Sequence, residues 1–316
     1  MRLSQKDNLL KSLQENPFVL APMAGITDSA FRSFMRHLGC GVVVTELVSA
    51  TGLSFKSART QKLMAFTEDQ HPVGVQLFGD DPLHLGEAAK EVQDLGADFV
   101  DLNFGCPVPK VVKKGAGSAM MKDLPAMKKI LQSVRASIQI PLTIKIRTGW
   151  EDSNRNAGEV VRLAADEGVS WVAIHGRTRA QGYSGSADWD FISEVKSQSP
   201  IPIIGNGDIV SAKMAVDRLT NSGCDGVMIG RGCLRNPFIF QQARERLAQK
   251  PETTPMSYTE VFKLLKHYLE KSVDSDRIMQ IQLKKFAAWY SSGYSGAAAF
   301  RKEIFQLKAV NEIMDF

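Results

Sequence analysis

The sequence contains few cysteines and no long apolar run, and each deficit excludes a class of protein. Its four cysteines, Cys40, Cys106, Cys224 and Cys233, are scattered and show no Cys-x-x-Cys spacing. This distribution indicates a reducing compartment and argues against a disulfide framework or a zinc site. No apolar stretch approaches the roughly 20 residues of a membrane-spanning helix. Residues 1–16 lack the apolar core of a secretory signal, so we expect a cytoplasmic protein with no membrane or metal partner.

The charge balance is only mildly basic. Of the 316 residues, 44% are hydrophobic and 23% are charged, which is ordinary for a soluble globular chain. The net charge of +5 and the isoelectric point near 8.9 permit a polyanionic partner without requiring one.

A rhythm of strand and then helix repeats eight times along the chain. Short apolar, β-branched runs alternate with amphipathic stretches such as 83–95, 125–136 and 159–167. Such unbroken apolar runs indicate parallel strands that are buried on both faces. Eight units in about 240 residues predict an α/β fold, the (β/α)8 TIM barrel, with an open doubly wound sheet as the alternative. The predicted strands are 18–21, 42–45, 73–77, 99–103, 142–146, 171–175, 201–205 and 226–230.

The pattern changes in the last quarter of the chain. Residues 251–255, Pro-Glu-Thr-Thr-Pro, are typical of a linker. Helical stretches with apolar positions three and four apart follow at 258–272, 277–292 and 297–310. From residue 241 onward there are twelve Lys and Arg against nine Asp and Glu. We therefore expect a barrel domain over residues 1–245 and a small C-terminal helical bundle domain over residues 246–316.

Polar residues gather where the predicted strands end. In such barrels the chemistry lies at the carboxyl ends of the strands, whereas the strand interiors only pack. Every predicted strand here ends in a polar side chain or a small-residue loop. In chain order these groups are Pro22-Met23-Ala24-Gly25, Glu46, Gln76, Asn103, Cys106, Lys145, Arg147, His175, Arg177, Asn206-Gly207-Asp208 and Gly230-Arg231.

The loop that contains Cys106 is the most informative of these ends. Gly105 and Pro107 stop the strand and force a tight turn. The turn would hold a thiol at the mouth of the barrel beside the amide of Asn103. We interpret Cys106 as a residue that reaches a ligand; the alternative is a buried cysteine that packs as a small hydrophobe.

Glycine-rich exits from the last two strands predict a phosphate site. They are Gly205-Asn206-Gly207-Asp208 and Gly230-Arg231-Gly232. Glycines let backbone N–H groups approach an anion, and these two loops are the usual phosphate site of a barrel. Arg231 and His175 would add charge-assisted bonds. The alternative is that the glycines only make tight turns; no segment fits the Gly-x-Gly-x-x-Gly dinucleotide fingerprint.

Lys145 and Arg147 are two residues apart on one strand, so both point into the barrel mouth. A buried Lys needs an acceptor, which would be either a ligand or a structural carboxylate such as Asp101 or Glu46. The amides of Gln76 and Asn103 suit the edges of a heteroaromatic ring. A phosphate site, an amide-lined cavity and a buried cation together suggest a phosphorylated flavin.

Several segments together match one known family. They are Ala-Pro-Met-Ala-Gly-Ile-Thr-Asp at 21–28, Gln-Leu-Phe-Gly at 76–79, Asn-Phe-Gly-Cys-Pro at 103–107, Gly-Ala-Gly-Ser-Ala at 115–119, Lys-Ile-Arg-Thr-Gly at 145–149, His-Gly-Arg-Thr-Arg at 175–179, Tyr-Ser-Gly at 183–185, Asp-Trp at 188–189, Gly-Asn-Gly-Asp at 205–208 and Gly-Arg at 230–231. Across essentially its whole length the chain resembles the tRNA-dihydrouridine synthases, in particular the bacterial B-type branch.

The resemblance implies FMN in the barrel mouth, NADPH as the hydride source, and reduction of the C5–C6 double bond of a uridine in the tRNA D-loop. By position, Cys106 would be the general acid. Asn103, Arg147 and Arg177 would contact the substrate. The residues that would bind FMN are Pro22, Met23, Ala24, Gln76, Lys145, His175, Asn206, Gly207, Asp208, Gly230 and Arg231.

The helical tail departs from the family pattern. Lys284 and Phe286 stand where relatives often have Arg and His, which leaves open how the tail grips tRNA. We expect Lys284, Lys285 and Arg301 to contact tRNA. Trp289 and Tyr290 would either stack on bases or pack in the core of the bundle. No protein partner is implied, and we expect a monomer.

Two rival functions remain open from the sequence. One is a small-molecule FMN barrel of the dihydroorotate or dihydropyrimidine dehydrogenase kind, which would not need the helical tail. The other is a non-catalytic tRNA-binding protein that kept the barrel, against which the intact Cys106, Lys145 and His175 argue.

Overall fold

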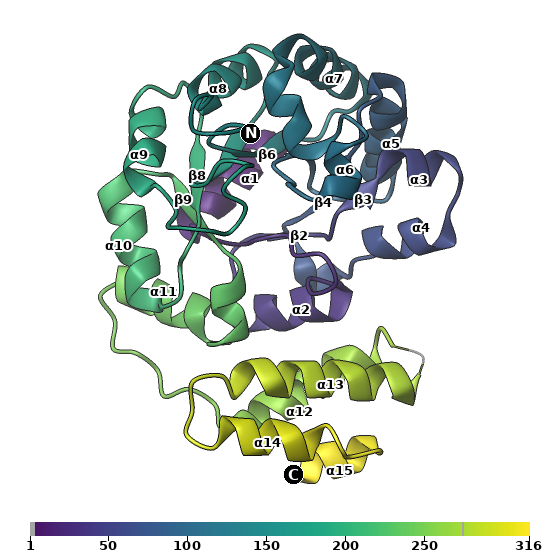
Figure 1. Ribbon diagram of the computed structural model, residues 1–316, viewed down its shortest axis with the longest axis vertical. Coiled ribbons are helices and arrows are strands. Elements are labelled where there is room, and N and C mark those ends of the chain that lie inside the picture. The colour runs from purple at the N-terminus through teal and green to yellow at the C-terminus, as the bar shows by residue number, and fades with distance from the viewer. Residues whose placement is uncertain (1–3, 274) are drawn as a thin grey trace.

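The computed structural model describes residues 4–273 and 275–316, and its core is a parallel sheet rolled into a barrel (Figure 1). The strands are hydrogen-bonded in the order β1-β9-β8-β7-β6-β5-β4-β2, with β3 beside β4. An isolated bridge between Val19 and Val42 closes the barrel. The strands are β1 Phe18–Leu20, β2 Val43–Val44, β3 Val48–Ser49, β4 Val73–Phe78, β5 Phe99–Phe104, β6 Leu142–Arg147, β7 Trp171–His175, β8 Ile203–Asn206 and β9 Gly226–Ile229.

Helices surround the barrel, and the predicted (β/α)8 fold is confirmed. The three helices expected at 83–95, 125–136 and 159–167 appear as α5, α7 and α8, within two residues at each end. The helices of this part are α1 Gln5–Glu15, α2 Ser29–His37, α3 Ala50–Ser54, α4 Ala58–Met64, α5 Pro82–Asp94, α6 Pro109–Val112, α7 Leu124–Ser137, α8 Ala157–Asp166, α9 Trp189–Ser197, α10 Ala212–Ser222 and α11 Ile239–Leu247, with 3-10 turns η1 Glu68–Gln70, η2 Gly117–Lys122 and η3 Arg231–Leu234.

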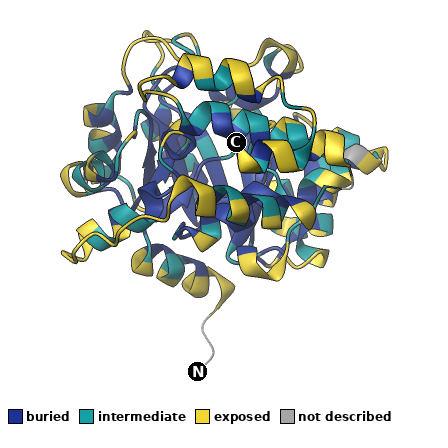
Figure 2. Cartoon of the chain, turned by 90° about the horizontal axis from the view of Figure 1, so that it is seen from below, coloured by how far each residue is buried: buried dark blue, intermediate teal, exposed yellow. Residues whose placement is uncertain are grey.

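Two apolar cores hold this architecture together. Alternate strand residues face the surrounding helices and form the larger core. The others face the barrel axis, where the smaller core includes Phe99 and Trp171. Leu9 and Leu13 of α1 join that inner core, so this helix closes the amino end of the barrel. Buried residues accordingly concentrate in the strands and on the inward faces of the helices (Figure 2).

The structure differs from the predicted elements at the start of the chain. The strand expected at 42–45 is reduced to Val43–Val44, and a second short strand, β3, follows it. The helix α1 precedes the first predicted strand and lies outside the predicted alternation, whereas α2 lies between the first two strands as the alternation predicts. Residues 1–3 of the predicted barrel domain lie outside the described residues.

The C-terminal tail packs beside the barrel as four helices (Figure 1). They are α12 Tyr258–Glu270, α13 Asp276–Tyr290, α14 Ala297–Ile304 and α15 Val310–Asp315. Residues 248–257 connect the last barrel helix, α11, to α12. The domain division at residue 245 stays a prediction.

The helix predicted at 297–310 is confirmed only in its first part, because α14 ends at Ile304 and a separate helix, α15, begins at Val310. Lys284 donates from Nζ to the carbonyl oxygens of Phe305, at 3.2 Å, and of Leu307. The carboxylate of Glu312 accepts from the backbone N–H groups of Lys308 and Ala309, at 2.7 and 3.0 Å. A cation at the carboxyl end of one helix and an anion at the amino end of the next stabilise the break.

Aromatic stacking joins the tail to the barrel. Phe286 of α13 lies on Phe31 of α2, with ring centroids 5.1 Å apart and planes 13° apart. Tyr268 of α12 makes a 3.2 Å hydrogen bond with Nδ1 of His37, at the end of α2. The tail is therefore seated on α2, next to the loop that leaves β1.

We expect Phe286→Ala to loosen the tail. Phe286 is 1% exposed, and truncation of a buried Phe costs about 3–5 kcal/mol. The variant should unfold at lower guanidinium concentration and be cleaved faster by protease within residues 248–257. The matched control is Phe305→Ala, since Phe305 also lies in the tail but is 53% exposed. If both substitutions lowered stability equally, the Phe31–Phe286 stack would not be what holds the tail against the barrel.

Candidate active site

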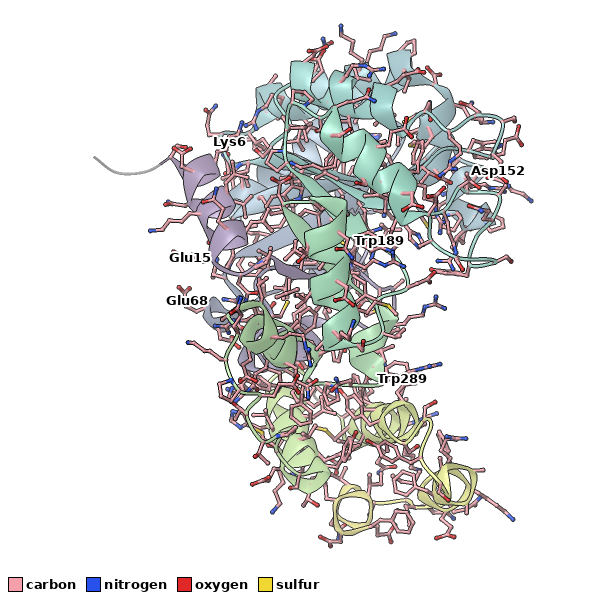
Figure 3. All side chains as sticks on the ribbon, turned by 90° about the vertical axis from the view of Figure 1, so that its left-hand side faces the viewer. Lys6, Glu15, Glu68, Asp152, Trp189 and Trp289 are labelled. Carbon is pink, nitrogen blue, oxygen red and sulfur yellow. The ribbon has the colours of Figure 1, made fainter. Side chains whose placement is uncertain are left out.

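A cavity of about 770 Å³ opens at the carboxyl end of the barrel. This volume lies within the roughly 300–1,000 Å³ of typical cofactor and small-ligand sites. In Figure 3, Asp152, in the loop after β6, marks this end, and Lys6 and Glu15 of α1 mark the opposite end. The predicted residues that line the cavity are Pro22, Met23, Ala24, Gln76, Asn103, Cys106, Lys145, Arg147, His175, Asn206, Gly207, Asp208, Gly230 and Arg231.

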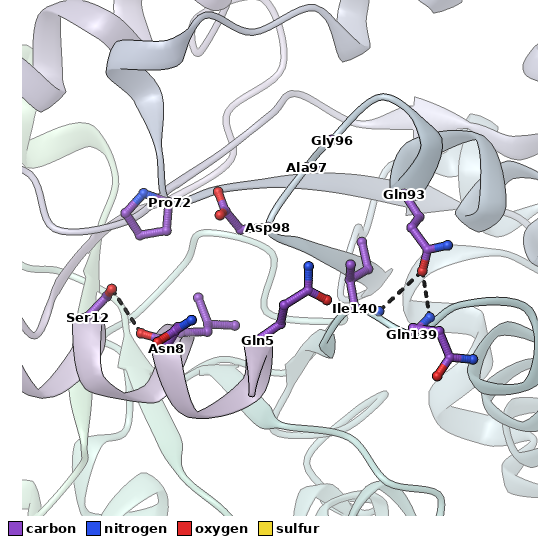
Figure 4. A pocket seen from close by; sticks show the side chains of 11 residues that line it. Gln5, Asn8, Ser12, Pro72, Gln93, Gly96, Ala97, Asp98, Gln139 and Ile140 are labelled. Atoms are coloured by element: carbon purple, nitrogen blue, oxygen red, sulfur yellow. Dashed lines mark hydrogen bonds between the residues drawn. The ribbon is translucent and has the colours of Figure 1, made fainter. Parts of the chain in front are cut away.

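A second cavity, of about 360 Å³, lies at the amino end between α1 and the ends of α5 and α7 (Figure 4). Its polar groups serve the barrel itself. Oε1 of Gln93 accepts from the N–H groups of Gln139 and Ile140, at 2.6 and 3.3 Å. The carboxylate of Asp98 accepts from the N–H of Val73 at 2.6 Å. No predicted site residue lines this cavity.

A relay of buried hydrogen bonds runs under the first cavity. Asp101 accepts from Oγ1 of Thr143 and from Nε2 of Gln76, each at 2.6 Å. Oε1 of Gln76 accepts from Nδ2 of Asn103 at 2.9 Å. Oδ1 of Asn103 accepts from the backbone N–H of Cys106 at 2.8 Å. The relay, defined here as Thr143, Asp101, Gln76 and Asn103, therefore fixes the loop that carries Cys106.

Backbone contacts hold the same loop from the other side. Ser118 donates from its hydroxyl and its N–H to the carbonyl of Cys106, at 2.9 and 3.1 Å. This approach requires glycine at Gly117, where φ is +61° and a Cβ would lie 2.8 Å from that carbonyl oxygen. Cys106 is thus positioned from both flanks.

The thiol of Cys106 is the one cysteine side chain of the chain that is not buried. This exposure, together with its place in the cavity wall, argues against packing as a small hydrophobe. Partial burial of the thiol nevertheless raises the pKa of Cys106, against lesser opposing effects from Val108, Arg147 and Lys145. The group is therefore a protonated thiol at neutral pH.

Lys145 reaches across the cavity to the next-but-one strand. Its Nζ donates to Oδ1 of Asn206 at 3.1 Å. Burial, and then the charge of Arg147, lower the pKa of Lys145 to about 8. A direct bond to Asp101 or Glu46, the structural alternative, does not occur among the described hydrogen bonds and ion pairs; the two oxygens of Asp101 serve Gln76 and Thr143.

The far end of the cavity is cationic. Arg231 begins η3, and its guanidinium lies 4.7 Å from the ring centroid of Tyr183. Burial, and then the cations Lys145, Arg147, Arg177 and Arg231, lower the pKa of His175 to about 2. His175 is therefore neutral and can offer an N–H without an added charge. Packing requires glycine at Gly207, since a Cβ there would lie 2.5 Å from that of Ala187.

The carboxylate of Asp208 is turned away from any anion in the cavity. Its two oxygens accept from Nη1 and Nη2 of Arg177, at 2.8 and 2.9 Å. The N–H of Ala187 also donates to Oδ2, at 2.7 Å. Only the backbone of Asp208 remains to meet a phosphate.

The two arginines predicted to contact substrate are largely engaged by the protein. Arg147 donates to the carbonyl oxygens of Gly105, Thr178 and Gly182, at 2.8–2.9 Å. It still lines the cavity. Arg177 is 3% exposed, is paired with Asp208 and is not among the lining residues. Its substrate contact stays a prediction, and in this structure it holds loops together.

The predicted tail residues divide into internal and peripheral groups. Lys284 serves the carbonyls between α14 and α15, as described above. Lys285 donates from Nζ to the carbonyl of Gly25 at 3.0 Å, beside the cavity wall. Tyr290 is 2% exposed and packs in the core. This confirms the second interpretation given for it, packing in the bundle core. Trp289 and Arg301 are half-buried, and contact of Lys284, Lys285 and Arg301 with tRNA stays a prediction.

Sequence reasoning missed some residues that line the cavity. Tyr183 is 64% exposed and lies near Arg231 and His175; its motif was noted, but no role was assigned to its side chain. Arg235 adds a further cation one turn after Arg231. Apolar lining from Ile26, Leu47 and Met228 carries no sequence signal that separates it from ordinary core.

Most polar side-chain groups that the cavity wall leaves free for a ligand are hydrogen-bond donors. The amide oxygens of Gln76, Asn103 and Asn206 already accept bonds from protein groups. Each of these amides uses one N–H internally and keeps a second. Lys145 likewise has donors to spare. The preferred ligand therefore carries several acceptor oxygens or nitrogens and negative charge.

Two sequence comparisons find relatives over most of the chain. A family model described as dihydrouridine synthase matches residues 19–315. A probable tRNA-dihydrouridine synthase of Rickettsia conorii is 39% identical over 286 residues, which cover 90% of this chain and 86% of the relative. The tRNA-dihydrouridine synthase B of Pseudomonas syringae pv. tomato is 38% identical over 288 residues, with 90% and 86% covered.

A solved structure supports the fold alone. The structure of histamine dehydrogenase from Rhizobium sp. 4-9 superposes with a TM-score of 0.55 at 12% identity and covers 80% of this chain. This chain spans about half, 49%, of that larger one. Within the described residues no helix has the length and apolar character needed to cross a bilayer. The family match extends over nearly the whole chain, and the protein belongs to the dihydrouridine synthase family.

Proposed function

We propose that this protein reduces the C5–C6 double bond of a D-loop uridine in tRNA, with FMN as cofactor and NADPH as the electron donor. The observation that carries the proposal is the set of spare donors in the cavity around Cys106. A flavin ring, a uracil and a phosphate are all rich in acceptors, so the lining suits each of them. The names of the relatives, tRNA-dihydrouridine synthases, support tRNA as the substrate.

The residues present fit FMN. The backbone N–H groups around Gly207 and Gly230, with the guanidinium of Arg231, suit its phosphate. Lys145 and Gln76 would donate to the ring. Pro22, Met23 and Ala24 would line the ring with backbone and apolar surface. When bound and reduced, FMN supplies the hydride that adds to C6 of the uracil.

Cys106 would supply the proton that C5 requires. Because its pKa is raised by burial, the thiol carries that proton throughout the neutral range. Asn103 fixes the loop backbone and keeps one N–H for a uracil carbonyl. A donor held in place stabilises a developing negative charge better than a mobile water does, because it does not have to reorient during the reaction.

The target base must leave the tRNA stack to enter the cavity. Extrusion costs on the order of a few kcal/mol, and phosphate contacts and stacking outside the cavity can offset it. The decisive experiment maps dihydrouridine in tRNA from a strain that lacks this gene, with and without complementation. Free uracil or orotate turned over without tRNA would instead favour the small-molecule dehydrogenase.

Replacing Cys106 by alanine should leave cofactor binding intact and reduce turnover by a factor of about 10²–10⁴, the usual contribution of a positioned acid. The measurements are the flavin absorbance per protein and the rate of dihydrouridine formation. Cys224→Ala is the matched control, because Cys224 is buried away from this cavity. Wild-type turnover in Cys106→Ala would exclude the acid role.

Removal of Arg231 should weaken the hold on FMN. A charge-assisted hydrogen bond contributes about 1.5–3 kcal/mol, so Arg231→Ala should raise the dissociation constant roughly tenfold to a hundredfold. Titration of the apoprotein with FMN measures the change. Arg162→Ala is the control, since Arg162 lies exposed on α8. An unchanged constant in Arg231→Ala would remove Arg231 from the phosphate site.

The raised pKa of Cys106 predicts a particular pH dependence of thiol modification. Only the thiolate reacts with iodoacetamide, so the rate should remain low at neutral pH. It should reach half its plateau above the pKa of about 8.5 of a free cysteine. Mass spectrometry of the Cys106 peptide measures the rate, with glutathione as reference. A midpoint below that of glutathione would show a thiolate-stabilising site and contradict the acid role.

A further inference from the structure

The indole of Trp289 lies at the seam between the tail and the mouth of the barrel. In Figure 3 this residue lies where the tail meets the barrel. The edge contact with Phe286 has a centroid distance of 5.2 Å and an interplanar angle of 81°. Phe286 is itself locked on Phe31, so the orientation of the indole is set in advance.

Lys285 connects this indole to the cavity. Its ammonium lies 5.2 Å from the ring centroid of Trp289 and 3.0 Å from the carbonyl oxygen of Gly25. Ala24 and Ile26, on either side of Gly25, both line the cavity. The centroid of the indole ring therefore lies no farther from the carbonyl oxygen of Gly25, at the edge of the cavity, than the sum of those two distances. We call this edge, residues 24–26, the lip of the cavity.

The other tryptophans do not offer the same arrangement. Trp171 and Trp189 are 1% and 4% exposed and belong to the core. Trp150 is half-buried, but two cations, Lys122 and Arg179, lie 4.2 and 4.5 Å from its ring centroid, whereas one cation lies 5.2 Å from that of Trp289. Trp289 thus combines partial exposure, a preset orientation and a direct link to the cavity lip.

We propose that Trp289 is a stacking platform for a nucleobase next to the uridine that enters the cavity. The inference rests on the proposed function, because it requires an RNA segment at the mouth. A partly exposed indole beside a cation can recognise an unpaired nucleotide, with the ring under the base and positive charge near the phosphate. Lys285 acts as a positioning residue that ties the platform to the lip through Gly25.

The test measures binding of an unmodified tRNA transcript to the flavin-loaded protein. Loss of one base–aromatic stack should weaken binding roughly 5- to 100-fold in Trp289→Ala. Trp289→Phe should recover most of the affinity, because the smaller ring still stacks. Binding of Trp289→Ala within twofold of wild type, at equal flavin content, would overturn the proposal.

Fluorescence supplies a readout that is independent of turnover. Stacking of a base should quench the emission of Trp289, so tRNA should quench the wild type and Trp150→Phe more strongly than Trp289→Phe. Equal fractional quenching in Trp289→Phe and the wild type would also overturn the proposal.

The two proposals fail in different ways. If the wild type forms no dihydrouridine but loses tRNA affinity on Trp289→Ala, the platform stands and the proposed reaction falls. If the wild type forms dihydrouridine and Trp289→Ala binds tRNA normally, the reaction stands and the platform falls.

Discussion

The relay from Thr143 through Asp101 and Gln76 to Asn103 is the interaction on which the site depends. Each of its side chains is buried, and a buried polar group that loses its partner costs about 1–3 kcal/mol. The relay therefore has one low-energy arrangement, and that arrangement ends at the backbone of Cys106. Burial raises the pKa of Asp101, while the bonds from Gln76 and Thr143 oppose the rise. The barrel core and the position of the thiol are thus parts of one hydrogen-bonded structure.

The same relay decides the polarity of the cavity. Because the amide oxygens already accept bonds from protein groups and each amide keeps one N–H, the wall favours ligands that bring hydrogen-bond acceptors. The cations around His175 reinforce this preference: burial, and then these cations, lower the pKa of His175 and keep its imidazole neutral, while the cations favour negative charge nearby. We therefore expect a preference for acceptor-rich, anionic ligands from how the wall satisfies its own hydrogen bonds.

Sequence periodicity predicted which side of the barrel a residue faces but could not predict its partner. The alternation along β6 correctly placed Lys145 and Arg147 on one face, because side chains in a strand alternate. The acceptors of Arg147 come from Gly105, Thr178 and Gly182, which only the closed barrel brings together. For the same reason Lys284 looked like a surface cation, whereas its acceptors are carbonyls about twenty residues later. The break at residues 305–309 carries no Gly or Pro, and so left no signal in the sequence.

The tail does more than add positive charge, because it forms a hydrogen bond to the backbone at the edge of the cavity. The N–H of Gly25 donates to the carboxylate of Glu46 in the barrel, and its carbonyl accepts from Lys285 in the tail. Gly25 has a φ of +73°, a conformation that suits glycine. Displacement of α13 would therefore pull on the backbone between Ala24 and Ile26, which lines the cavity. The Phe31–Phe286 stack and the hydrogen bond from Lys285 therefore hold the tail in place beside the cavity.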